Sequence, residues 1–143
     1  MKTIKRSVYI SGIIIAGGAL IAFIAFLKLY NKPHTDVYAS DPDYTLTAKA
    51  LVETFKTDEA RANSLYLDKI IEVEGVIKDI SAADGNSVIT LSVENSIESV
   101  ICNMYPTENK KTLGLHTGQK IRVKGICTGF LLDVILVRAV ISG

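Results

Sequence analysis

The stretch KIIEVEGVI at residues 69–77 decides the fold of this chain. Ile71 and Val73 alternate with two glutamates, and this period of two predicts a strand with one buried face. Gly75 then interrupts the alternation, as glycine does where a strand bulges or bends sharply. A long first strand that bends at a glycine is typical of a small β-barrel. We therefore expect the residues on either side to supply the rest of a barrel.

Four more strands are predicted downstream, each from alternating apolar and polar residues. They cover residues 88–93, 98–104, 120–128 and 133–141. The turn signal Asp84-Gly85 precedes the first of them, and a polar connector with a helical turn, 107–115, separates the second from the third. Together these features predict a mainly β fold, a five-stranded OB-fold Greek-key barrel. A plain antiparallel sandwich is the alternative, although it usually has about seven strands.

Two short helices are predicted before the barrel. Thr47 is a good N-cap, and the apolar residues that follow it form the stripe of a helix that ends near Lys56. We expect Thr57 to cap a second helix, which runs to about Tyr66 with acidic residues in its first turn. The helices and the barrel form one expected domain, residues 44–143.

An uncharged run of 21 residues, 7–27, lies near the N-terminus. At about 1.5 Å per residue, a helix of this length spans roughly 32 Å, enough to cross the hydrocarbon core of a bilayer. We therefore predict a single transmembrane helix over 7–27, a basic leader at 1–6 and a linker at 28–43. A cleaved signal peptide with Gly17-Gly18-Ala19 as its cleavage site is the alternative. The apolar core of such a peptide is typically only about 7–15 residues long.

Basic residues are denser before this segment than after it. The leader, 1–6, contains three of them, whereas the far flank has only Lys28 and Lys32. The positive-inside rule therefore predicts a cytoplasmic N-terminus and a C-terminal domain outside the cytoplasm. Small residues one turn apart, as in Gly12-xxx-Ala16, would let two such helices pair within the membrane.

Four segments carry a resemblance to a known family. They are YLDKIIEVEGVI (66–77), VITL (88–91), VICNM (100–104) and VKGICTGFLLDVIL (123–136). The most specific part is the string of Gly125, Cys127, Gly129, Asp133 and Leu136. These segments resemble the tRNA_anti-like family of bacterial OB-fold proteins, and NKPH at 31–34 is similar to members with an N-terminal anchor. The resemblance implies a barrel, with no assigned activity and no catalytic residues to carry over. With the apolar span, we expect a single-pass protein of the bacterial inner membrane. Ala139 stands where relatives often have a second cysteine.

The charge of the chain is divided unevenly. Residues 1–32 hold five basic and no acidic residues, so the rest holds 11 basic and 15 acidic residues, a net charge of −4. A domain that binds nucleic acid usually shows a basic face, and binding of single strands also depends on stacking aromatics. The strand at 88–93 has no aromatic residue, and the next strand has none before Tyr105. Single-stranded nucleic-acid binding is therefore disfavoured and is kept as the alternative function.

OB-folds bind ligands across their second and third strands and the adjoining loops. The residues that we expect to face outward there are small and mildly polar: Val88, Thr90, Ser92, Ser99, Ile101 and Asn103. Such a surface suits a protein or a saccharide better than a polyanion, although an ordinary solvated face has the same composition. We therefore expect a membrane-anchored, periplasm-facing binding or adaptor module.

The sequence predicts no enzyme, cofactor or metal site. No Ser or Cys nucleophile has a His and acid partner by motif, and no glycine-rich phosphate loop opens a helix. Cys102, Cys127, His34 and His116 are scattered without the spacing of zinc ligands. Both cysteines share a strand face with apolar neighbours, so we expect two buried thiols inside the barrel. A disulfide between them is the alternative, which an oxidising compartment would favour.

Overall fold

The computed structural model describes residues 2–30 and 35–143, and the chain divides into two units, Met1–Thr35 and Asp36–Gly143. The first unit contains helix α1, Lys2–Tyr30. Its Gly12–Tyr30 part is long and apolar enough to cross a membrane, a property that signal sequences share. The predicted span, 7–27, lies inside this helix. The 31–34 part of the expected linker lies outside the described residues.

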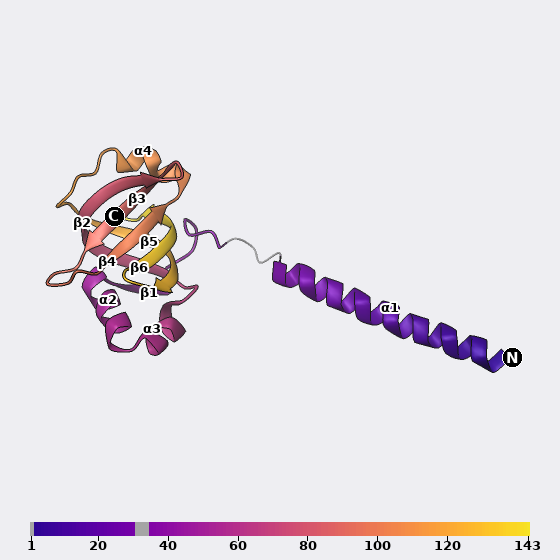
Figure 1. Ribbon diagram of the computed structural model, residues 1–143. Helices are drawn as coiled ribbons and strands as arrows, with labels where there is room; N and C mark the ends of the chain where they lie inside the picture. Colours follow the sequence, from indigo (N-terminus) through magenta and orange to yellow (C-terminus); the bar gives the residue numbers. More distant parts are fainter. Residues whose placement is uncertain (1, 31–34) are drawn as a thin grey trace. The chain divides into compact units, whose positions relative to one another are not determined.

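The second unit is built on a closed barrel of five strands (Figure 1). The strands are β2 (Ile70–Ala83), β3 (Asn86–Ser92), β4 (Ser99–Met104), β5 (Lys120–Phe130) and β6 (Val134–Ile141). They follow the order β2-β3-β4-β6-β5, and β5 pairs with β2 to close the barrel. The connector between β4 and β5 contains η1 (Pro106–Glu108) and α4 (Asn109–Thr112). The fold is therefore the predicted OB-fold, helical connector included.

A further strand, β1 (Tyr44–Thr47), was not predicted. It pairs in parallel with β2, so that Tyr44 lies opposite Ile71 and Thr47 opposite Glu74. Sequence patterns miss such a strand because it has only four residues, most of them exposed, and no alternation of buried positions. Its place at the edge of the sheet depends on a partner that comes later in the chain.

Two helices follow this strand. They are α2 (Ala48–Thr57) and α3 (Glu59–Tyr66). Thr47 caps α2 as predicted, because its hydroxyl accepts a hydrogen bond of 3.2 Å from the N–H of Ala50. The predicted cap of the second helix was wrong by one residue. Asp58, not Thr57, accepts from the N–H of Arg61 at 3.0 Å, and its negative charge is also favourable at a helix N-terminus.

The core fills the barrel and continues onto the buried face of α2. Ile71 and Val73 are fully buried, as the alternation predicted. Gly75 does not mark the bulge that we expected there. The register between β2 and β3 shifts between Ile77 and Asp79, and Gly75 instead lies where a Cβ would come within 3.1 Å of the Leu91 Cβ. Close packing, rather than a bulge, explains the glycine.

Residues 36–43, which we expected to belong to a linker, pack on the outside of the barrel. Val37 is fully buried against a small cluster that includes Ile70. Asp43 binds the same residue twice: its N–H donates to the Ile70 carbonyl at 2.8 Å, and its carboxylate accepts from the Ile70 N–H at 2.9 Å. The compact unit therefore begins at residue 36 rather than at residue 44.

A buried carboxylate also holds this segment. Glu108 is 1% exposed and accepts hydrogen bonds from the Tyr38 hydroxyl at 2.7 Å, the Lys111 ammonium at 2.8 Å and the Ile141 N–H at 3.0 Å. Burial by itself raises the pKa of Glu108, but the three donors together lower this pKa by more, so it lies below its ordinary value. Glu108 therefore remains a carboxylate that joins the N-terminal segment to the connector and to β6.

The two cysteines are buried and free. Cys102 on β4 and Cys127 on β5 both lie opposite Leu136, because β6 runs between their strands. Two strand spacings separate them, about 9–10 Å between Cα atoms, whereas a disulfide needs about 7 Å or less. This spacing favours two thiols over a disulfide, and burial raises the pKa of Cys102 to about 12.

Candidate functional site

The outward residues of β3 and β4 lie side by side, but two that we expected to be exposed there are covered: Val88 is 9% and Ser99 is 3% exposed. The pairs across the two strands are Val88 with Asn103, Thr90 with Ile101, and Ser92 with Ser99. The intervening residues of both strands, such as Ile89 and Cys102, point into the barrel and are fully buried. The predicted face residues are therefore brought together by a simple two-residue alternation. We refer to this surface as the β3–β4 face.

Ser99 does not offer its side chain to a ligand, and its place in the predicted face is corrected. It is only 3% exposed, with the Lys78 ammonium 3.5 Å from its hydroxyl. Its N–H donates to the carboxylate of Asp133 at 2.6 Å. Ser99 thus connects the start of β4 to the β5–β6 turn. Sequence alternation gave the correct side of the strand but could not show what covers it.

The β3–β4 face has an apolar centre that the sequence analysis missed. Ile101 on β4 lies opposite Ile135 on β6, and both side chains are half-buried on the outside of the barrel. Thr90, Ser92 and Asn103, all partly exposed, lie around them. The alternation of residues along β6 could have shown that Ile135 points outward, because its neighbour Leu136 points inward. The parallel pairing of β4 with β6, which sets Ile135 beside Ile101, is a tertiary feature that the sequence pattern does not reveal.

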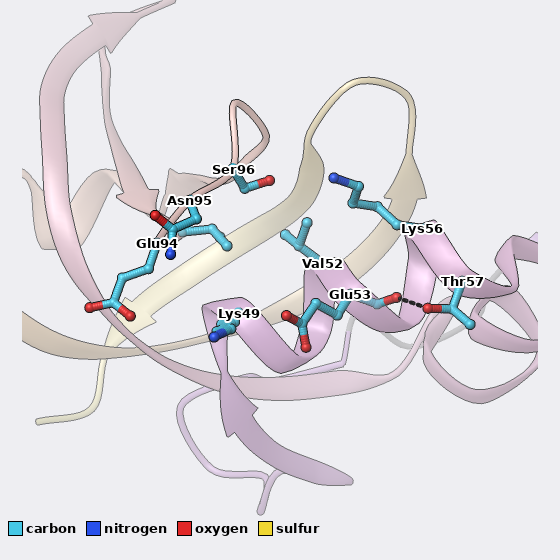
Figure 2. Close-up of a pocket in the computed structure, with 9 residues that line it drawn as sticks. Lys49, Val52, Glu53, Lys56, Thr57, Glu94, Asn95 and Ser96 are labelled. Atoms are coloured by element: carbon cyan, nitrogen blue, oxygen red, sulfur yellow. Dashed lines mark hydrogen bonds between the residues drawn. The ribbon is translucent and has the colours of Figure 1, made fainter.

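A hollow of about 320 Å³ lies between α2 and the loop that joins β3 to β4 (Figure 2). Its lining residues are Lys49, Val52, Glu53, Lys56, Thr57, Val93, Glu94, Asn95 and Ser96. The rim carries charges of both signs, and buried valines lie beneath it. The volume is at the lower end of the range for ligand sites, about 300–1,000 Å³, so the hollow has room for one side chain or a small ring.

The β3–β4 loop is held in place by Glu98. Its carboxylate binds the Lys56 ammonium of α2 at 3.0 Å and also accepts from the hydroxyl of Ser96. The hydrogen bond from Ser96, the bond to its own backbone and the Lys56 contact lower the pKa of Glu98 to about 2. The loop that borders the hollow is thus joined to the helix by an ion pair.

No catalytic arrangement is found among the described residues. His116 is exposed in a turn, where its backbone N–H donates to the side-chain carbonyl of Gln119 at 3.2 Å. The thiols are buried, and burial raises the pKa of Cys127 as it does that of Cys102. Over residues 2–30 and 35–143, no three His, Cys, Asp or Glu side chains gather as metal ligands would. A non-enzymatic, cofactor-free protein stays a prediction.

The comparison with protein families decides the assignment. The model of the tRNA_anti-like family matches residues 1–141, nearly the whole chain. The chain belongs to the tRNA_anti-like family. The N-terminal helix lies within the match, together with the barrel.

Two solved structures that are similar to this tRNA_anti-like protein share about a fifth of its residues in the aligned region. A Klebsiella pneumoniae subsp. pneumoniae lipoprotein described as nucleic acid-binding is 20% identical, with a TM-score of 0.59 over 78% of this chain and all of that one. A chain of the S. pombe Stn1–Ten1 complex is 21% identical, with a TM-score of 0.39 over 48% of this chain and 52% of that one. The first likeness supports the fold alone, and the second is too weak to support an argument. No curated protein matches the sequence.

The site of this tRNA_anti-like protein thus has two adjoining parts, the β3–β4 face and the hollow beside α2. For the first part, the sequence analysis correctly placed Thr90, Ser92, Ile101 and Asn103. It missed Ile135 and wrongly expected Val88 and Ser99 to be exposed. The second part was missed because α2 and residues 93–96 are distant in the chain and are joined by tertiary contacts.

Proposed function

We propose that this protein is a non-catalytic binding module, tethered to the bacterial inner membrane by α1, which recognises a protein through its β3–β4 face in the periplasm. The observation that carries the proposal is the pairing of Ile101 with Ile135 inside a rim of small polar side chains. An apolar centre with a polar rim is the usual anatomy of a protein–protein contact.

Other ligand classes fit this face less well. A saccharide would need a dense array of hydrogen-bonding groups, whereas β3 and β4 offer three partly exposed polar side chains here, Thr90, Ser92 and Asn103. Neither β3 nor β4 contains an aromatic or basic residue, so these two strands themselves offer none of the stacking or phosphate contacts on which binding of single-stranded nucleic acid depends. Nucleic-acid binding is retained as the alternative because the Klebsiella lipoprotein of the same fold is described that way.

The tether is tested by a fusion of alkaline phosphatase to the C-terminus. The apolar Gly12–Tyr30 segment and the basic residues before it predict an active, membrane-bound enzyme. Active enzyme in the soluble fraction would mean that α1 is a cleaved signal sequence. An inactive fusion of full length would mean that the orientation is reversed.

The binding face is tested with a photo-reactive amino acid placed at Thr90 or at Asn103 in cells. We expect a defined protein adduct from both positions, and none from the matched control at Glu59, which is exposed on α3. Ile101→Asp should abolish the adduct, whereas Ile101→Val should retain it. Adducts that are equal at Glu59 would contradict the proposal.

Fluorescence anisotropy with labelled oligonucleotides at low salt tests the alternative function, binding of single-stranded nucleic acid. We expect no binding at micromolar protein. Binding that weakens as salt is added, as phosphate contacts require, would show that the ligand is nucleic acid and not a protein.

A further inference from the structure

Both ends of the barrel expose aliphatic side chains, and one end is formed by the β3–β4 loop and the β5–β6 turn. Ile97 in the loop is 91% exposed, and Leu131 and Leu132 in the turn are 83% and 80% exposed. All three line one hollow of about 400 Å³ together with Phe130, so the loop and the turn are neighbours. We call Ile97, Leu131 and Leu132 the apolar tip. Single exposed leucines are common, but three aliphatic side chains that gather on adjoining loops form a patch.

A carboxylate lies at the edge of the apolar tip. Asp133 follows directly after Leu132 and also lines the hollow. Its carboxylate accepts from the Ser99 N–H at 2.6 Å, a bond to a neutral group that leaves the negative charge in place. Among the residues that the structure describes, no cation forms an ion pair with Asp133, whereas the neighbouring Glu98 is paired with Lys56. The apolar tip thus combines aliphatic side chains with one negative charge that is not ion-paired.

The other end of the barrel, away from α2, carries α4 (Figure 1). Asn109 of α4 binds the Ser87 N–H at the start of β3, whereas Ile97 follows the end of that strand. Leu113, the residue after α4, is 86% exposed and keeps helical backbone angles, φ −62° and ψ −25°. Lys110 precedes it by three residues, so the two side chains lie on the same side of this turn. We call Lys110 and Leu113 the α4 corner.

The α4 corner has the opposite charge to the apolar tip. Lys110 is exposed, and over residues 2–30 and 35–143 no ion pair is found for it. The next residue, Lys111, differs because its ammonium binds the Glu108 carboxylate at 2.8 Å. Each end of the barrel therefore offers exposed aliphatic surface beside one charge, and complementary charges help two surfaces to pair in the correct register. The chain itself supplies the partner that each surface requires.

We propose that the α4 corner of one copy docks on the apolar tip of a second copy, with Leu113 over the hollow and Lys110 beside Asp133. The volume of the hollow is at the lower end of the range for ligand sites, about 300–1,000 Å³, which suits a single aliphatic side chain. Because the two surfaces differ, the contact is heterologous and leaves one free surface on each copy of a pair. Copies therefore associate head to tail and not as two-fold dimers.

The contact surface is small. A standard protein interface buries about 800 Å² on each partner, which is more than a few exposed side chains supply. We therefore expect a weak contact between concentrated copies, which chemical cross-linking detects better than sedimentation does. The contact uses neither Ile101 nor Ile135, so it goes beyond the proposed function of the β3–β4 face.

The test uses two versions of the concentrated, purified full chain, each with its own tag and one added surface cysteine. Thr128→Cys in the first chain lies near the apolar tip, and His116→Cys in the second chain lies near the α4 corner; both positions are exposed. The native Cys102 and Cys127 are fully buried, so they do not react with a short bis-maleimide, which links thiols that lie close together. Glu59→Cys, exposed on α3, is the control partner for the second chain.

We expect the first chain to be linked to the second in clear excess over either chain with itself and over the Glu59→Cys control. More linking within one variant than between the two would indicate a two-fold contact and would overturn the head-to-tail arrangement. Equal linking of all pairs, as random collisions or pairing through α1 would give, or no linking at all, would overturn the contact altogether.

Substitutions in the two surfaces test the docking itself. Leu132→Asp in the first chain, or Leu113→Asp in the second, should remove the excess, and the fold should be retained because both side chains are exposed. Lys110→Glu in the second chain should weaken linking most at low salt, because a like charge then faces Asp133. Asp133→Asn in the first chain keeps a hydrogen-bond acceptor for β4 and should restore part of this linking. An excess that survives both leucine substitutions would contradict the proposal.

Discussion

At the scale of single residues, Gly75 shows how close packing selects a side chain. A Cβ at this position would lie 3.1 Å from the Cβ of Leu91 and 3.2 Å from that of Ala48. Both neighbours are Cβ atoms, so a change of rotamer cannot move them away. Because Gly75 has no side chain, β2 and α2 can pack closely at this position.

Gly75→Ala is therefore expected to destabilise the barrel by about 1–3 kcal/mol, the usual cost of overpacking. The measurement is urea unfolding of residues 36–143. Gly114→Ala is the matched control, because its Cβ would meet only the Lys111 carbonyl at 3.7 Å and the change should stay within about 0.5 kcal/mol. Equal effects of the two substitutions would refute the packing explanation.

Glu108→Gln tests the buried carboxylate. Three donors converge on Glu108, so loss of the charge should cost about 1–3 kcal/mol at pH 7. The pKa of Glu108 is lowered on folding, so the carboxylate stabilises the fold fully above the unfolded value of 4.5 and loses this effect as the pH falls through the folded pKa. The difference in unfolding free energy between the two proteins should therefore shrink below pH 4.5. A difference that is independent of pH would contradict this account.

At the scale of elements, α4 holds the β2–β3 hairpin. The side chain of Asn109 accepts from the Ser87 N–H at 2.9 Å and donates to the Gly85 carbonyl at 3.0 Å. Thr112 of the same short helix shares a hydrogen bond of 2.7 Å with the Ser87 hydroxyl. A helix of four residues has little stability of its own, so its role here is to place these side chains.

Asn109→Ala should loosen the hairpin while leaving the barrel folded. We expect faster hydrogen exchange of the Ser87 amide, by about the 5- to 30-fold that 1–2 kcal/mol represents. Lys110→Ala, on the exposed side of the same turn, is the control and should leave this rate unchanged. Unchanged exchange in Asn109→Ala would show that β-sheet pairing alone holds the hairpin.

At the scale of the whole molecule, the barrel unit includes the segment just after the expected anchor. Val37 is fully buried, and Tyr38 supplies one of the donors to Glu108. The segment therefore contributes to the stability of the fold in addition to connecting it to α1.

Residues 36–143 should fold without α1, and removal of 36–43 should weaken the fold. We expect residues 44–143 to be less stable by about 2.5–6 kcal/mol, since burial of one valine is worth about 1.5–3 kcal/mol and an orphaned buried partner costs about 1–3 kcal/mol. Denaturant midpoints of the two fragments give the comparison. Equal midpoints would mean that the folded domain begins at residue 44 and that residues 36–43 do not stabilise it.

By itself, the sequence determined the period of each barrel strand, the cap of α2 and the apolar N-terminal helix, because these depend on near neighbours in the chain. From them followed the OB-fold and most of the β3–β4 face. Only the tertiary structure decided that β1 pairs with β2, that Ile135 lies beside Ile101, that Ser99 is covered and that Val37 packs on the barrel. These features join residues far apart in sequence, and local periodicity carries no information about which distant surface will bury a given side chain.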